Sequence, residues 1–163
     1  MMNRLLSLLT ILLLALPLFA EKEDPRFTEL DAFWAKVSLA VKEGDFESYS
    51  ETCHPEAVLV SGTKETSYPL AQALVRWKEE FDNTRAGKVK SSVEFRFGHR
   101  YGDESTAHES GMFLYTSQNP GEEAKREFIH FEGLLIKREG QWLMLMEYQK
   151  SRGTEAEWNA LEH

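Results

Sequence analysis

Residues 44–62, GDFESYSETCHPEAVLVSG, contain the junction that decides the predicted fold. Gly44 is suited to end a preceding helix, and Asp45 is a favourable N-cap for a short second helix. Pro55 disfavours helix in the residue before it, and the apolar run 57–60 is typical of a short strand. The stretch therefore predicts two helices that meet at Gly44, followed by the first strand.

Amphipathic segments lie on both sides of this junction. Their apolar residues recur three or four positions apart, which is the spacing of one helix face. The first stripe consists of Phe27, Leu30, Trp34, Val37 and Val41, and the later one of Leu70, Leu74, Trp77 and Phe81. We therefore expect a long first helix that ends at Gly44, and a third helix that starts near Ser67 and Pro69.

After Gly87 the apolar period changes from that of a helix to that of a strand. The alternating segments are 89–101, 106–116, 128–137 and 142–149. Glycine-containing or proline-containing turns separate them, as in an antiparallel meander. The predicted fold class is α+β, in the order α-α-β-α-β-β-β-β, with the helices gathered on one side of a curled sheet.

Three motifs in this order resemble the SnoaL-like branch of the nuclear transport factor 2-like superfamily. They are Gly44-Asp45-Phe46 with Tyr49 and His54-Pro55-Glu56-Ala57-Val58, then Tyr101-Gly102-Asp103, then Glu139-Gly140-Gln141-Trp142. The resemblance covers about residues 27–151. It implies a cone: a curved antiparallel sheet wrapped round the long N-terminal helix, open at one end as a pocket and often paired through the sheet into dimers.

The ketosteroid isomerase branch of the same superfamily has a carboxylate base just past the first strand and a tyrosine on the first helix. The matching positions here hold Ser61 and Val37, and a third carboxylate position falls near Glu132. Ser61 and Val37 cannot supply that chemistry. The resemblance therefore does not carry that reaction over to this chain.

Residues 1–20 have the pattern of a secretory signal peptide. Arg4 supplies a positive charge, residues 5–19 form an apolar run, and Ala20 precedes an acidic segment. The run is shorter than the roughly 20 residues of a helix that spans a bilayer. We expect cleavage after Ala20 and a periplasmic or secreted product, with no membrane association after cleavage.

The chain after this point is expected to form one domain at 21–151, followed by a polar tail at 152–163 in which Trp158 and Leu161 dock. Loss of the signal removes one arginine and changes the net charge from −8 to −9. Such an acidic domain is a poor partner for nucleic acid. With Cys53 as the single cysteine, an intrachain disulfide is excluded, and no sequence motif points to a metal or a cofactor.

The candidate catalytic residues are His130 and Glu132. Strand alternation puts them on one face among apolar neighbours, where burial would raise the pKa of Glu132 and the pair would act as acid and base. The alternative is that this face is the lateral surface of the sheet, where the pair makes solvated or dimer contacts. The sequence alone leaves open whether the protein is an enzyme.

The candidate ligand-binding residues are mainly aromatic side chains at core spacing. They are Trp34, Tyr49, Trp77, Phe95 and Phe113, together with Glu147. Glu147 lies in a strongly apolar strand, where we expect an arginine or histidine partner across the sheet. An apolar pocket with a few polar groups is the usual form of a small-molecule site.

Three functions follow from these patterns. The first is an exported SnoaL-like domain that binds a small apolar molecule. The second is an acid/base enzyme, of isomerase or dehydratase type, that uses His130 and Glu132. The third is a homodimeric protein-interaction module without a ligand, which exposed Ile129, Phe131, Leu143 and Leu145 would favour.

Overall fold

The computed structural model describes residues 25–161, so the predicted signal peptide lies outside the described part of the chain. The elements are α1 (Pro25–Glu43), α2 (Phe46–Ser50), β1 (Cys53–Ser61), β2 (Thr66–Pro69), α3 (Leu70–Arg85), β3 (Lys90–Gly102), β4 (Thr106–Gln118), β5 (Lys125–Arg138), β6 (Gln141–Arg152) and α4 (Glu155–Ala160). The predicted order is present, with β2 and α4 as additions. The segment at Ser67, expected to start a helix, instead pairs as β2 with β1.

The six strands form one sheet in the order β2-β1-β6-β5-β4-β3. Strands β3 to β6 make the predicted antiparallel meander. The sheet is nevertheless mixed, because β1 lies parallel to β6, with Leu59 opposite Glu147. The predicted antiparallel sheet did not include this parallel pair, because local alternation shows which segments are strands but not which distant strands pair.

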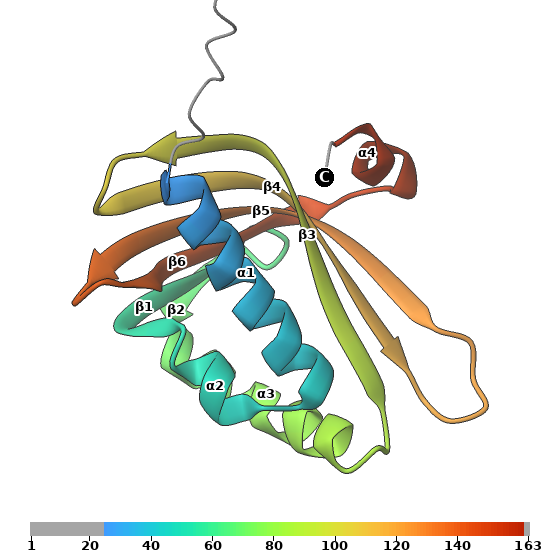
Figure 1. The fold of residues 1–163 in the computed structure, drawn as a ribbon. Helices are drawn as coiled ribbons and strands as arrows, with labels where there is room; N and C mark the ends of the chain where they lie inside the picture. The colour runs from blue at the N-terminus through green and yellow to red at the C-terminus, as the bar shows by residue number, and fades with distance from the viewer. Residues whose placement is uncertain (1–24, 162–163) are drawn as a thin grey trace, which may run out of the picture.

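Helix α1 crosses the concave face of the bent sheet, and α2 and α3 lie towards one end of it (Figure 1). The predicted stripe faces the sheet: Leu30, Trp34 and Val37 are at most 5% exposed. Asp45 caps α2 as expected, its carboxylate accepting a hydrogen bond from the Ser48 amide at 3.2 Å. The predicted α+β cone, a curved sheet round a long N-terminal helix, is confirmed.

A bulge in β6 changes which side chains face the helices. Leu135 pairs with Met144, but the preceding Leu134 pairs with Met146, so Leu145 is an extra residue on β6. Simple alternation places Met144 and Glu147 on opposite faces of the sheet. The bulge brings both onto the inner face.

Helix α4 covers part of the outer face of the sheet. A capping box between Thr154 and Glu157 starts it. Its Trp158 is 3% exposed and packs with Met112 and Leu114 of β4. The predicted docking of Trp158 therefore takes place from a short helix. No helix within residues 25–161 has the length and apolar content to cross a membrane.

Candidate functional site

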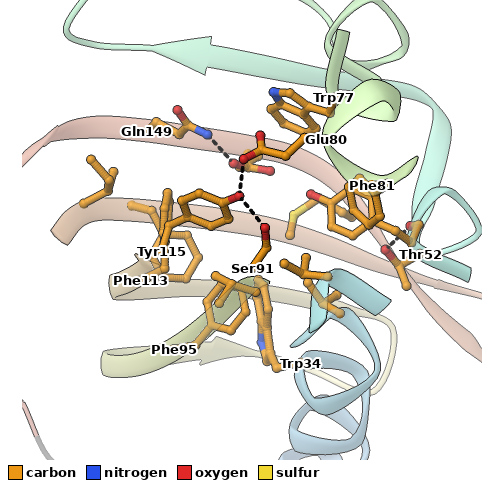
Figure 2. Close-up of a pocket in the computed structure, with 18 of the residues that line it drawn as sticks. Trp34, Thr52, Trp77, Glu80, Phe81, Ser91, Phe95, Phe113, Tyr115 and Gln149 are labelled. Carbon is orange, nitrogen blue, oxygen red and sulfur yellow. Dashed lines mark hydrogen bonds between the residues drawn. The ribbon is translucent and has the colours of Figure 1, made fainter. Parts of the chain in front are cut away.

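A cavity of about 270 Å³ lies between the helices and the concave face of the sheet (Figure 2). Its walls come from α1, α2, α3 and five of the strands. Eight aromatic residues line it: Trp34, Tyr49, Trp77, Phe81, Phe95, Phe113, Tyr115 and Phe131. All six residues that the sequence predicted as ligand contacts, Trp34, Tyr49, Trp77, Phe95, Phe113 and Glu147, meet here.

The aromatic wall is held by edge and tilted ring contacts. The rings of Trp34 and Phe95 are 4.4 Å apart between centroids, and those of Phe113 and Phe131 are 5.8 Å apart. Such contacts fix ring positions. This side of the cavity is therefore a preformed apolar surface.

Trp34 is anchored by a carboxylate whose role the sequence did not reveal. The indole Nε1 of Trp34 donates a hydrogen bond to Oε2 of Glu109, which is fully buried. The Arg100 Nε donates to Glu109 Oε1 at 2.5 Å, and Arg100 also pairs with Asp31 at 2.6 Å. A fully buried carboxylate needs such partners. Glu109 therefore orients an indole ring that lines the cavity.

Glu147 is one of the polar residues that line the cavity. Its Oε1 accepts a hydrogen bond from Gln149 Nε2 at 2.7 Å. Burial raises the pKa of the Glu147 carboxyl, and the Gln149 hydrogen bond offsets this in part. Among the described residues neither an arginine nor a histidine bonds to it, so the expected cross-sheet ion pair is absent. Strand alternation could not show this because the partner depends on register and on the bulge.

Tyr49 and Cys53 lie near Glu147. Burial raises the pKa of the Tyr49 hydroxyl well above its usual value, and the Glu147 charge adds to the shift. Burial likewise raises the pKa of the Cys53 thiol to about 12, despite the hydrogen bond with Thr52. A thiolate is the reactive form of cysteine. Cys53 is thus a neutral wall residue rather than a nucleophile near neutral pH.

A second group of polar side chains lies between α3 and the ends of β3 and β4. The Tyr115 hydroxyl donates to Glu80 Oε1 at 2.5 Å and lies 3.3 Å from Ser91 Oγ (Figure 2). Thr84 Oγ1 donates to the same Ser91 oxygen at 3.0 Å. Sequence reasoning missed this group. The sequence pattern could have predicted it. Glu80 follows Trp77 by one helical turn, and Tyr115 is two positions from Phe113 in a strand, so each shares a face with a predicted cavity residue.

The structure places His130 and Glu132 on the outer face of the sheet, away from the cavity lining. The Glu132 carboxylate is 3.1 Å from His108 Nε2 and 2.6 Å from Lys150 Nζ. The hydrogen bond from Lys150 lowers the pKa of Glu132, with a smaller contribution from His108. The expected rise in this pKa was wrong, because the side chain is paired near the surface rather than buried in the cone.

His130 is engaged with α4 instead. Its Nε2 lies 3.4 Å from Glu157 Oε1. In β4 it is Glu109 that points inward, while His108 meets Glu132 on the outer face. Within residues 25–161 no group of three or more histidine, cysteine or acidic side chains is arranged to hold a metal ion.

Solved structures with the same architecture identify the fold. An NTF-2-like protein of unknown function from Shewanella oneidensis is 12% identical, with a TM-score of 0.59 over 76% of this chain and 97% of that chain. ActVI-ORFA from Streptomyces coelicolor is 12% identical, with a TM-score of 0.60 over 77% and 96%. A protein of unknown function from Mycobacterium tuberculosis is 17% identical, with a TM-score of 0.62 over 79% and 72%.

The chain therefore has the nuclear transport factor 2-like fold, which confirms the resemblance drawn from its sequence motifs. No protein-family model matches the sequence, and neither does any curated protein. Similarity at this level of identity establishes the fold alone, and one fold hosts many activities. The function has to be argued from the cavity itself.

Proposed function

We propose that this domain binds a small, mainly apolar molecule in the cavity of the cone. The observation that carries the proposal is the cavity of about 270 Å³, with aromatic walls and a few polar groups. Small-molecule sites commonly have volumes of about 300 to 1,000 Å³ and this mixture of surfaces. A volume just below that range suits a ligand of one or two rings.

Native mass spectrometry of the purified protein tests this proposal. We expect an added mass that is present in the folded protein and lost on denaturation. A second sample, stripped of ligand by refolding, should recover the same added mass from an extract of its source. A protein that carries no added mass in either sample would contradict the proposal.

A substitution that fills the cavity tests whether the ligand binds there or at another surface. Ile129 lines the cavity, so Ile129→Trp should abolish the bound mass. Val75 is 77% exposed on α3 and does not line the cavity, which makes Val75→Trp the matched control. Retention of the ligand by Ile129→Trp, in a folded protein, would place the ligand elsewhere.

We also propose a homodimer formed through the outer face of the sheet. The part of this face on β1, β5 and β6 carries a row of partly buried apolar side chains: Val58, Val60, Leu134, Met146 and Tyr148. No other described element packs over them, since α4 covers Met112 and Leu114 near β3. Of the residues named earlier for this role, Phe131 is 1% exposed and Ile129 lines the cavity.

Export remains a proposal that rests on residues 1–20. The protein isolated from the cell envelope or the medium should begin at Glu21, which N-terminal sequencing would establish. A product that retains Met1 and stays in the cytoplasm would contradict it.

A further inference from the structure

The cavity contains several ionisable groups, and none of them is a cation. The titratable side chains that line it around Glu147 are Tyr49 on α2, Cys53 on β1, Glu80 on α3, Tyr115 on β4 and Glu127 on β5. Among residues 25–161, no lysine, arginine or histidine belongs to the lining. The sign of the charge in this cavity is therefore uniform and negative.

Glu147, which is half-buried, differs in this respect from Glu109, the fully buried carboxylate of the domain. Glu109 is neutralised by the guanidinium of Arg100 at 2.5 Å. Glu147 receives the neutral amide of Gln149, and its charge disfavours ionisation of both Tyr49 and Cys53 beside it. A buried carboxylate is costly without a compensating charge. The protein gives Glu147 no compensating positive charge, and a bound cation can supply one.

We propose that the ligand of this cavity is a protonated amine on an aromatic or otherwise apolar body, with its ammonium group beside the Glu147 carboxylate. This inference rests on the proposed function of the cavity as a small-molecule site. It adds the charge of the ligand, which the apolar walls alone do not determine.

The rings near Glu147 suit the same ligand. Tyr49 contacts Trp77 at 6.2 Å and Phe81 at 5.0 Å between ring centroids, so three aromatic side chains line this part of the cavity together. Aromatic faces attract cations, and desolvation strengthens that attraction. The net charge of −8 favours approach of a cation from solution as well.

A neutral carbonyl ligand is the competing possibility. Burial raises the pKa of Glu147, so a protonated carboxyl group could donate a hydrogen bond to a carbonyl oxygen. The two ligands respond oppositely to pH. An ammonium ion binds more tightly as Glu147 ionises, whereas a carbonyl acceptor binds more tightly as Glu147 becomes protonated.

Three probes of nearly equal shape test the proposal by calorimetric titration of the purified full chain. They are 1-naphthylmethylamine, 1-naphthylmethanol and 1-naphthoate, which present a cation, a neutral group and an anion on the same ring system. We expect the amine to bind about tenfold more tightly than the alcohol, from ion pairing and ring contacts together. The carboxylate should bind more weakly than either.

Glu147→Gln should bring the amine and alcohol affinities together while the alcohol still binds. The matched control is Glu94→Gln, the same change at an exposed strand position outside the cavity lining, which should keep the preference. On the unmodified protein, the amine affinity should rise with pH through the titration of Glu147. This second measurement stands even where Glu147→Gln fails to fold.

The outcomes separate the two proposals. Equal binding of amine and alcohol, or a preference for the alcohol, overturns the amine inference and leaves the small-molecule site in place. An amine preference that survives Glu147→Gln overturns the role of Glu147. Failure of all three probes to bind counts against the small-molecule site and the amine together.

Discussion

At the scale of single residues, the two inward carboxylates of the sheet have different environments. Glu109 has an indole donor and a guanidinium, whereas Glu147 has one amide donor and lies beside the neutral side chains of Tyr49 and Cys53. The first arrangement satisfies a buried charge, and the second leaves it poorly compensated. Glu109 therefore contributes to the stability of the cone, while Glu147 costs stability in the empty protein.

The Glu147 environment predicts an unusual pH dependence of stability. Its folded-state pKa is raised above the ordinary value of 4.5, so folding favours the protonated form. Protonated Glu147 therefore stabilises the fold fully below pH 4.5. This contribution to the free energy of unfolding is lost as pH rises through the folded-state pKa. Urea denaturation of Glu147→Gln should show a flatter profile above pH 4.5 and greater stability than the unmodified protein at pH 8. A variant that is equally or less stable at pH 8 would contradict this.

Removal of the Glu109 carboxylate should be strongly destabilising. Glu109→Ala leaves the Trp34 indole without its acceptor and Arg100 without its buried partner. Breaking a buried pair costs about 3 to 5 kcal/mol, and we expect a loss in that range by urea denaturation. Glu94→Ala, on an exposed strand position, should change stability by less than about 0.5 kcal/mol. Similar losses in the two variants would show that Glu109 is not a structural anchor.

At the scale of elements, the turn from α1 into α2 is set by Gly44. Its φ of +68° lies in the left-handed region, and a Cβ there would come within 2.4 Å of the Arg85 backbone nitrogen at the end of α3. The Asp45 amide donates to the Ala40 carbonyl at 2.8 Å, and the Arg85 Nε donates to the Gly44 carbonyl at 3.0 Å. This turn therefore holds three helices against one another at one end of the cone.

Two glycine substitutions distinguish the stability cost of an unfavourable backbone conformation from the cost of a steric clash. Gly87 has a φ of +70° with nothing within 4 Å of an added Cβ, so Gly87→Ala should cost about 1 kcal/mol of stability, from conformation alone. Gly44→Ala adds the contact with α3 and should cost at least twice as much in thermal denaturation. Equal costs would mean that α3 moves aside freely.

At the scale of the whole molecule, the two faces of the sheet have separate roles. The concave face, with α1, α2 and α3, encloses the cavity. The convex face carries α4 near β3 and β4 (Figure 1). It also carries the apolar row on β1, β5 and β6. The strand alternation that puts cavity residues inside puts the residues of the proposed dimer contact outside.

The proposed dimer makes a direct prediction for sedimentation velocity. The unmodified protein should sediment as a dimer, and Met146→Lys, which places a charge in the middle of the apolar row, should sediment as a monomer. Val75→Lys is the matched control, because Val75 is 77% exposed on α3 and outside the row. A monomeric unmodified protein, or a dimer that survives Met146→Lys, would rule out this interface.

The sequence by itself determined the elements and the aromatic lining. The stripe of Trp34, the cap at Asp45 and the alternation around Phe95 and Phe113 are local patterns, so they predicted the helices, the meander and aromatic residues that line the cavity. The same patterns and three short motifs predicted the nuclear transport factor 2-like fold.

The tertiary structure decided which face of the sheet lines the cavity and which strands and side chains pair. Alternation placed His130 and Glu132 on one face. Whether that face points into the cone depends on which side of the sheet the helices cover, and it points outward. The parallel β1–β6 pair and the bulge at Leu145 are likewise set by register. Register depends on contacts between distant segments, so the position of Glu147 in the cavity without a cation was not encoded in any local pattern.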